Sequence, residues 1–501
     1  MSQHSDPHRA GPLRLRWLAA GAALALGAAL APTASATPPG EPPRDPQACA
    51  PAFAATPSST VADPEVIGPI GDEGVRTRRP YGTTMVPLPE GWVEEEFFLD
   101  GTARDYPTGT AAPREAEYRT RIMVRRPADA DDFNGTVILD WNNVTIPHDR
   151  DVAWAPIYPT VLERGFAYVS VGAQRLGIEV SPLALKNYDP VRYGSLSHPG
   201  DDWSFDIFSQ AAEAVLDPQV MGELAPCVQR RIGMGASQSG GRLLTYVNRV
   251  QEHARVFDGF TPQISGSGNV RRDVVPVLWV NSTAEAADVP PDSDLFRLWE
   301  LAGAAHTSNQ SSSYQDEMLV FSHTNGAAGS WDPEVAGAWG YLSRPGDCLT
   351  RNHYQAGFVW AAAVVAVDEW LRTGVAPPSQ PRIERTADGA DEVFDEHGNA
   401  KGGVRGPLVD VPIASYYAGV TSPPGTHPCA RAGGASALSG TTHVFDAAKL
   451  RALYPTREAY LVQFDAAVER ALEAGTLLPE GAEALRARAL LAADWIAVST
   501  A

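Results

Sequence analysis

The chain has 501 residues, of which 44% are hydrophobic, and a formal net charge of -20 at pH 7. A chain of this length buries a large core and can form one large domain or two. It is acidic and has no basic stretch that could neutralise phosphates, so we expect no nucleic acid among its partners.

Residues 1–36 have the pattern of a secretory signal peptide. Arginines precede an apolar run at residues 17–31, and Ala34-Ser35-Ala36 offers a small-residue cleavage site. The run is short and rich in Ala and Gly, which favours a cleaved signal over the alternative, a membrane anchor. We therefore expect a secreted protein, extracellular or in the cell envelope, with no stable membrane span after signal cleavage.

Residues 37–68 are dominated by Pro, Ala, Ser and Thr, which is typical of a flexible leader. Four cysteines follow the signal: Cys49, Cys227, Cys348 and Cys429. In an oxidising compartment this even number predicts at least one disulfide, and the sequence leaves the three possible pairings open. No two of the four lie close together in the chain, so a metal site is not indicated.

Residues 69–375 alternate between strand and helix patterns. We expect strands at residues 93–99, 118–125, 135–141, 166–171, 231–234, 256–260, 274–280 and 296–301. We expect helices at residues 153–164, 203–216, 241–250 and 355–371. This alternation predicts an α/β fold with a mostly parallel, doubly wound sheet that helices cover on both faces.

The last part of the chain has two sections of different composition. Residues 376–445 are rich in Pro and Gly, and we expect an extended surface excursion near the functional site. Residues 446–501 carry two amphipathic patterns, at residues 457–473 and 480–495, which predict helices packed on the core. A role for these helices as a mobile lid stays open.

The strand at residues 231–234 leads into small residues around a serine, the pattern of a nucleophile elbow. Such a strained strand-to-helix turn tolerates only small residues two places before and after the nucleophile. Gly235 and Ser239 meet this condition for Ser237. Ser239 is the alternative nucleophile, flanked by Ser237 and Gly241, but glycine two places before the nucleophile favours Ser237. A Gly/Ser loop without chemistry is the remaining interpretation, and the partners of the serine decide.

A serine hydroxyl needs a neutral imidazole to take its proton and a carboxylate to orient that imidazole. In the hydrolase order of serine, acid and histidine, His306 follows the strand at residues 296–301 and is the predicted base. His353, at a helix start, is the alternative. The preceding strand, at residues 274–280, is followed by Glu285 and Asp288, and either carboxylate qualifies as the acid by its distance along the chain.

The oxyanion of an acyl-transfer intermediate needs two hydrogen-bond donors. The backbone N–H of Gln238, directly after the serine at a helix N-terminus, is one predicted donor. The loop Asn142-Asn143, which follows the strand at residues 135–141, is predicted to supply the other. Capping a turn is the alternative role of either asparagine.

With these residues in place, the sequence resembles the α/β hydrolase domain-containing proteins whose elbow reads Gly-x-Ser-Gln-Ser. The resemblance covers most of the chain after the signal. Its other marks are Phe133-Asn134-Gly135-Thr136-Val137, Asp189-Pro190-Val191-Arg192-Tyr193-Gly194, Phe205-Asp206-Ile207-Phe208-Ser209-Gln210, Leu298-Trp299-Glu300-Leu301-Ala302-Gly303 and Gly398-Asn399-Ala400-Lys401-Gly402-Gly403-Val404-Arg405. The resemblance implies an α/β hydrolase core at residues 69–375 and a serine hydrolase mechanism.

The resemblance also bears on two open choices. The elbow is similar to that of acetyl esterases with Gly-x-Ser-Gln-Gly-Gly, in which the first serine attacks, and this favours Ser237. The family's acid falls two residues after the Ser282-Thr283 pair, which implies Glu285 rather than Asp288. No substrate is implied, because this fold hosts many chemistries.

Together these patterns predict a secreted serine hydrolase that cleaves carboxylic esters of small-molecule or lipid-like substrates. An acyl-enzyme would form on Ser237, with His306 and Glu285 completing the triad, and we expect neither a metal nor an organic cofactor. Three alternatives stay open: an acyltransferase, an amidase or lactonase on the same triad, or a catalytically inactive extracellular binding protein.

Overall fold

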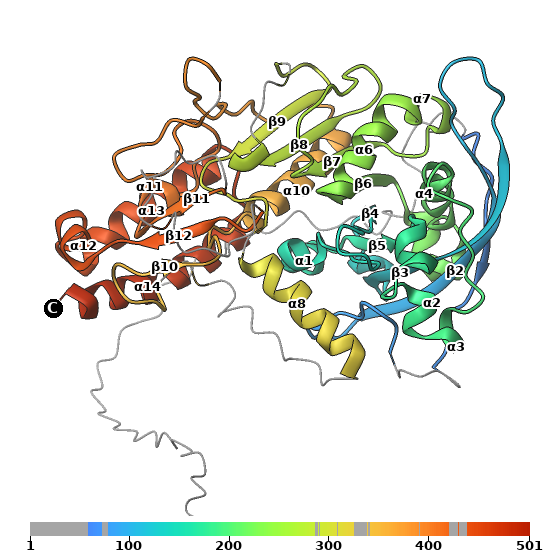
Figure 1. Cartoon of the computed structure of the whole chain (residues 1–501), viewed down its shortest axis with the longest axis horizontal. Helices are drawn as coiled ribbons and strands as arrows, with labels where there is room; N and C mark the ends of the chain where they lie inside the picture. Colours follow the sequence, from blue (N-terminus) through green and yellow to red (C-terminus); the bar gives the residue numbers. More distant parts are fainter. Residues whose placement is uncertain are drawn as a thin grey trace, which may run out of the picture. The chain divides into compact units, whose positions relative to one another are not determined.

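A nine-stranded sheet dominates the part of the chain that the computed structural model describes, namely residues 59–72, 79–285, 289, 291–307, 309–324, 338, 341–389, 391–419, 429 and 438–500. Its strand order is β1-β2-β3-β5-β4-β6-β7-β8-β9 (Figure 1). The strands are β1 (Glu65–Ile67), β2 (Trp92–Arg104), β3 (Glu115–Pro127), β4 (Thr136–Trp141), β5 (Ala167–Val171), β6 (Arg230–Ala236), β7 (Gly259–Gln263), β8 (Val277–Ser282) and β9 (Phe296–Leu301). From β5 to β9 all neighbours pair in parallel, whereas β1, β2 and β3 pair antiparallel. The expected α/β class with a mostly parallel sheet is confirmed.

The described helices are α1 (Trp154–Glu163), α2 (Leu185–Tyr188), α3 (Pro190–Tyr193), α4 (Ser204–Ala214), α5 (Pro218–Met221), α6 (Gln238–Arg249), α7 (Gln251–Ala254), α8 (Asn309–Thr324), α10 (Gly357–Thr373), α11 (Pro407–Asp410), α12 (Ala447–Leu453), α13 (Arg457–Glu473) and α14 (Pro479–Thr500). Helices α1 to α7 lie between strands of the parallel part of the sheet, and the remaining helices follow β9. Shorter helical turns are η1 (Ala130–Asp132), η2 (Leu176–Val180), η3 (Gly222–Cys227) and η4 (Thr283–Glu285). Among the described residues, none of these helices is both long and apolar enough to cross a membrane.

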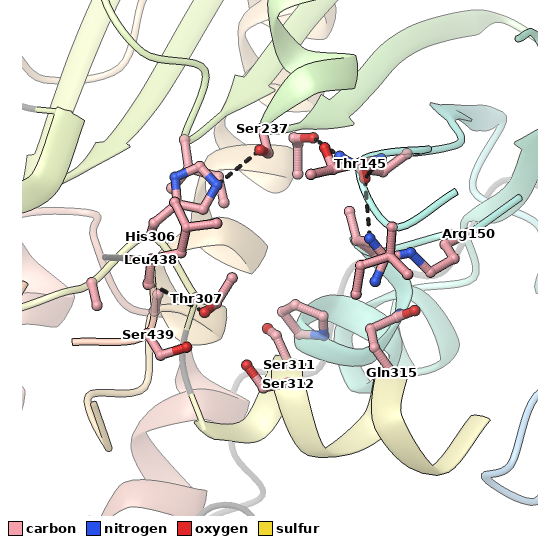
Figure 2. A pocket seen from close by; sticks show the side chains of 18 of the residues that line it. Thr145, Arg150, Ser237, His306, Thr307, Ser311, Ser312, Gln315, Leu438 and Ser439 are labelled. Carbon is pink, nitrogen blue, oxygen red and sulfur yellow. Dashed lines mark hydrogen bonds between the residues drawn. The ribbon is translucent and has the colours of Figure 1, made fainter. Parts of the chain in front are cut away.

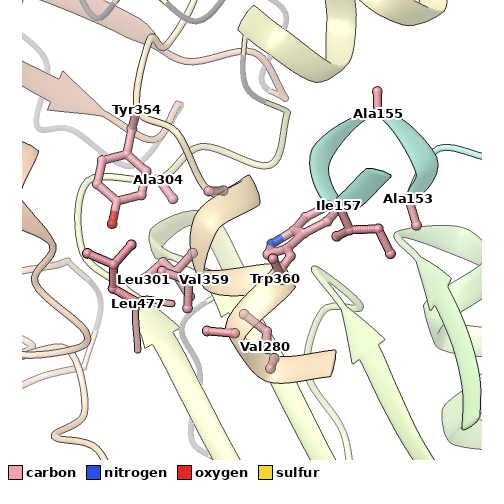
Figure 3. Close-up of a cluster of buried hydrophobic side chains, with 14 of the residues drawn as sticks. Ala153, Ala155, Ile157, Val280, Leu301, Ala304, Tyr354, Val359, Trp360 and Leu477 are labelled. Atoms are coloured by element: carbon pink, nitrogen blue, oxygen red, sulfur yellow. The ribbon is translucent and has the colours of Figure 1, made fainter. Parts of the chain in front are cut away.

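Alternate side chains of the central strands enter two separate cores, one on each face of the sheet. In β4, Val137 and Leu139 join a core with residues of α4 and α6, whereas Ile138 joins a core with residues of α1 and α10. Figure 3 shows part of the second core, with Trp360 of α10 beside Ile157 of α1 and Val280 of β8. Because both faces are covered, β4 is buried along its whole length, which explains its apolar run Val137-Ile138-Leu139.

Several expected elements differ from the observed ones in their bounds, and three strands illustrate the reasons. The first two strands extend well beyond residues 93–99 and 118–125, because β2 and β3 form one long antiparallel pair whose ends carry polar, partly exposed residues. The strand expected at residues 256–260 begins only at Gly259. Val256 and Phe257, which suggested the earlier start, are buried in the loop before β7 instead.

The expectation for residues 376–445, an extended surface excursion, is wrong for much of the described part. It contributes β11 (Ala414–Tyr417) and β12 (Thr441–Val444), which pair with β10 (Cys348–Leu349) in a second, antiparallel sheet of order β10-β12-β11. Val409 and Tyr416 are buried in the core. Short strands of this kind depend on pairing with distant segments, so local Pro and Gly content does not reveal them.

The second sheet is joined to the rest of this segment by a disulfide between Cys348 and Cys429, whose Cα atoms lie 5.4 Å apart. Cys227 is disulfide-bonded as well, and Cys49 lies outside the described residues. The prediction of at least one disulfide is therefore confirmed. The predicted signal peptide and most of the predicted leader also lie outside the described residues.

Candidate active site

Ser237 lies in the turn between β6 and α6 with φ 60° and ψ -122°, a strained backbone for a residue with a side chain. The turn is tight because the first turn of α6 closes directly onto the strand end. A Cβ at Gly235 would lie 3.1 Å from the backbone of Ser239, and one at Gly240 would lie 2.2 Å from Ser265 Oγ. These contacts explain the small residues of the motif and leave the Ser237 side chain at the carboxyl end of the sheet.

Ser239, the alternative nucleophile, has a different place. Its side chain is fully buried, its Oγ donates to the carbonyl oxygen of Ala236 at 2.9 Å, and the Ala236 N–H donates back to it at 3.0 Å. The hydroxyl of Ser239 therefore closes the elbow from within and does not reach the cavity that Ser237 lines.

Ser237 Oγ lies 2.8 Å from Nε2 of His306, in the loop after β9 (Figure 2). On the other side of the ring, Nδ1 of His306 is hydrogen-bonded to Oε1 of Glu285. With Nδ1–H donating to a carboxylate, Nε2 is the free acceptor for the serine proton. The three side chains that the sequence predicted as nucleophile, base and acid are thus joined in one hydrogen-bonded line.

Glu285 ends the single helical turn η4, which directly follows β8. Its second carboxylate oxygen, Oε2, accepts the backbone N–H of Ser282 at 3.2 Å and also the Ser282 hydroxyl. Thr283, which lies between Ser282 and Glu285 in the chain, donates its hydroxyl to the carbonyl oxygen of Leu301 at 2.8 Å. The loop of the acid and the loop of the base are therefore bonded to each other, which the sequence did not predict.

His353, the alternative base, is not part of this hydrogen-bonded line. His353 donates Nδ1–H to the carbonyl oxygen of Ala338 at 2.7 Å, and its backbone N–H donates to Thr442 Oγ1 at 2.9 Å. Burial lowers the pKa of His353 below its ordinary value. The structure thus places His353 against the second sheet, away from Ser237. Asp288 lies outside the described residues.

The predicted oxyanion donors are in three different situations. Gln238 is the first residue of α6, where backbone N–H groups have no partner within the helix, and its side chain pairs with Gln174. Asn143 lines the cavity beside Ser237 and donates Nδ2–H to the carbonyl oxygen of Ala236 at 2.9 Å. Asn142 is turned away, with Nδ2 donating to Asp149 at 2.8 Å.

The backbone N–H groups of Asn142 and Asn143 already have hydrogen-bond acceptors within the protein. The N–H of Asn142 donates to the Val171 carbonyl oxygen at 3.1 Å, and the N–H of Asn143 donates to the Arg150 carbonyl oxygen at 2.7 Å. Any donor from this loop to a bound substrate would therefore come from a side chain, and Asn143 is the residue in place for it.

Ser237 and His306 open onto a cavity of about 250 Å³. Figure 2 shows its walls: His306 and Thr307 on one side, Arg150 on the other, and the first turns of α8 with Ser311, Ser312 and Gln315 below. Neither α8 nor Arg150 was predicted from the sequence. Among the described residues, no cluster of three or more His, Cys, Asp or Glu side chains could hold a metal ion.

A nucleophile elbow on a mostly parallel sheet, with a carboxylate just after β8 and a histidine in the loop after β9, defines an α/β hydrolase. The chain belongs to the family described as "Alpha/beta hydrolase domain", whose model matches residues 66–487. Among curated proteins, none matches the sequence significantly.

Several solved structures share part of the fold. Esterase Est22 is 13% identical, with 38% of this chain and 64% of that chain covered and a TM-score of 0.24. An α/β serine hydrolase without a lid from Xanthomonas campestris is 13% identical, with 47% and 94% covered and a TM-score of 0.27. A glucuronoyl esterase from Solibacter usitatus is 13% identical, with 42% and 54% covered and a TM-score of 0.22. This chain thus spans less than two thirds of Est22, and at these scores none of the three bears on its substrate.

Proposed function

We propose that this protein is a secreted serine hydrolase that cleaves carboxylic esters through an acyl-enzyme on Ser237. The observation that carries the proposal is the hydrogen-bonded line from Ser237 Oγ through His306 to Glu285. Secretion rests on the signal pattern of residues 1–36, and the disulfide between Cys348 and Cys429 agrees with it.

In the first half of the reaction, His306 Nε2 takes the proton of Ser237 as Oγ attacks the ester carbonyl carbon. Glu285 stabilises the imidazolium that forms, and Ser282 holds the carboxylate in the orientation this requires. His306 then gives the proton to the leaving alcohol. In the second half, His306 activates a water that attacks the acyl-enzyme and releases the acid.

The developing oxyanion needs donors that are fixed before the reaction. The backbone N–H of Gln238 at the start of α6 is one, and the helix N-terminus adds a favourable dipole. The second is the Asn143 carboxamide, which has two N–H groups and donates to the Ala236 carbonyl oxygen next to the nucleophile. Removing one such donor typically costs on the order of a hundred- to a thousandfold in kcat.

The cavity of about 250 Å³ suits a small ester better than a long-chain lipid. The test is hydrolysis of p-nitrophenyl esters from acetate upward, combined with fluorophosphonate labelling and peptide mapping. We expect the fastest turnover with short acyl groups and the label on Ser237. Absence of both labelling and turnover with the folded protein would instead favour an inactive binding protein.

A further inference from the structure

Arg150 is a buried cation in the wall of the proposed substrate cavity. It belongs to a run of buried polar residues, 148–151, in the loop between β4 and α1. The residue as a whole is only 7% exposed. Figure 2 shows its guanidinium pointing into the cavity from the side opposite His306. A buried charge is costly unless something pairs with it, so its partners are informative.

The acidic neighbours of Arg150 in the loop are already paired. Asp149 accepts from Arg121 Nη1 at 3.0 Å, and Asp151 accepts from Arg125 Nη1 at 2.6 Å. Both of these arginines are buried on β3. The two ion pairs hold the loop against the sheet, and the residue between them, Arg150, is left facing the cavity.

The guanidinium of Arg150 itself has no carboxylate in ion-pair contact among the described residues. Its Nη2 donates to Asn143 Oδ1 at 3.2 Å, which is a neutral acceptor. Its Nε is buried and has no hydrogen-bond partner within the described part of the chain. Burial lowers its pKa to about 10, against smaller opposing effects of Tyr81, Asp316 and Asp151, so the group remains a cation at neutral pH.

A second arginine in the cavity wall provides a contrast. Arg351 donates to Asp316 Oδ2 at 2.8 Å, so its charge is already matched by a carboxylate of α8. Both of these side chains are more exposed than Arg150 and are screened by water. Within the described cavity wall, Arg150 is therefore the cation that lacks an anionic partner.

We propose that Arg150 binds a carboxylate of the substrate, so that the ester cleaved at Ser237 carries a negative charge away from the scissile bond. This rests on the proposed function. Asn143 connects the two sites, because its Nδ2 contacts the residue before Ser237 while its Oδ1 contacts Arg150. A carboxylate can accept two parallel N–H groups from a guanidinium, which would satisfy the buried Nε. A phosphate dianion would leave one charge uncompensated in a cavity that also contains Asp316.

The test compares esters that differ only in this charge. Monoethyl succinate is paired with ethyl levulinate, in which a methyl ketone replaces the carboxylate of the acyl group. Acetoxyacetate is paired with acetoxyacetone, which makes the same exchange in the alcohol. Longer half-esters, from glutarate to adipate, cover the distance to Arg150. We expect the charged member of at least one pair to have a kcat/KM about ten- to a hundredfold higher.

Four variants assign the preference to its residue. Arg150→Met should lower the charged-to-neutral ratio of kcat/KM by that same factor, and Arg150→Lys should recover part of it. Arg344→Met, at an exposed position outside the cavity, should leave the ratio as it is in the wild type. Equal kcat/KM values within every pair would overturn the proposal. So would a charged-to-neutral ratio that falls in Arg351→Met and is unchanged in Arg150→Met. Thermal melting verifies that each variant is folded.

Binding separates this proposal from the proposed function. Titration calorimetry with the Ser237→Ala variant measures binding of the charged half-ester without turnover. If no ester is hydrolysed but this binding occurs and is lost with Arg150→Met, the carboxylate site stands and the esterase proposal fails. If neutral esters are hydrolysed and no charged ester binds, the esterase proposal stands and the carboxylate site fails.

Discussion

Thr283 donates its backbone N–H to the carbonyl oxygen of Ala304 at 3.0 Å, and this bond ties the loop of Glu285 to the loop of His306. The Thr283 hydroxyl adds two more bonds, donating to Leu301 and accepting from the N–H of Gly303 at 3.0 Å. The acid and the base are therefore positioned by backbone groups as well as by their own hydrogen bond.

We expect Thr283→Val to lower kcat about ten- to a hundredfold with a smaller change in KM. A small misplacement of the acid and base loops weakens transition-state stabilisation more than it weakens substrate binding. The substitution also removes the hydrogen-bond acceptor of the buried Gly303 N–H, at a cost of about 1–3 kcal/mol in the free energy of unfolding. Thr283→Ser keeps the hydroxyl and should restore most of kcat. A Ser variant as slow as the Val variant would contradict this positioning role.

Ser237→Ala should lower turnover on the order of a millionfold, because it removes the nucleophile on which the other triad residues act. Ser239→Ala should retain substantial activity and instead lose about 1–3 kcal/mol of stability, since Ser239 Oγ satisfies both backbone groups of Ala236. Steady-state kinetics and thermal melting of the two variants provide the comparison. A fluorophosphonate label on Ser239 would reverse the assignment.

Glu285→Gln should lower kcat on the order of ten-thousandfold with a nearly unchanged melting temperature. The neutral amide cannot stabilise the imidazolium, and its NH₂ group favours the wrong tautomer of His306. Asp288→Asn is the matched control and should have a mild effect. If Asp288→Asn were the more damaging of the two, the acid would have to be reassigned.

His306→Ala should abolish turnover in a folded protein, whereas His353 should matter for stability. Because burial lowers the pKa of His353 from its ordinary 6.5, the folded state favours the neutral ring. The contribution of the neutral His353 ring to the free energy of unfolding is fully present above pH 6.5. It is lost as the pH falls below that value, because the unfolded chain takes up the proton first. Denaturant unfolding measures the free energy of unfolding at pH 7 and at pH 5. The decrease from pH 7 to pH 5 should be smaller for His353→Gln than for the wild type.

Removing the disulfide with the double variant Cys348→Ser and Cys429→Ser should lower the free energy of unfolding by about 2–4 kcal/mol, because the bond closes a loop with a sequence separation of 81. We also expect a raised KM. The second sheet reaches the active site through Asn352, whose Nδ2 donates to Gly303 at 2.8 Å and to Tyr417 at 3.1 Å. A KM equal to that of the wild type would show that this sheet does not support the cavity.

The sequence alone was enough to predict the α/β class, most strands of the parallel sheet and the three residues proposed as the triad. The physical reason is that these features are local. A strand buried on both faces is rich in consecutive apolar residues, as β4 is at Val137-Ile138-Leu139. The elbow requires small residues at fixed offsets from Ser237. Strand order then limits the acid and the base to two short loops, and the family resemblance favours Glu285 over Asp288 within the first of them.

The tertiary structure decided what depends on contacts between distant segments. The buried role of Ser239, the place of His353 against the second sheet and the bonds of Thr283 all involve partners that no local pattern specifies. The same holds for Arg150. In the sequence it is one charge in a polar loop. Only the pairing of Asp149 and Asp151 with two arginines of β3 leaves it facing the cavity with no carboxylate in ion-pair contact among the described residues.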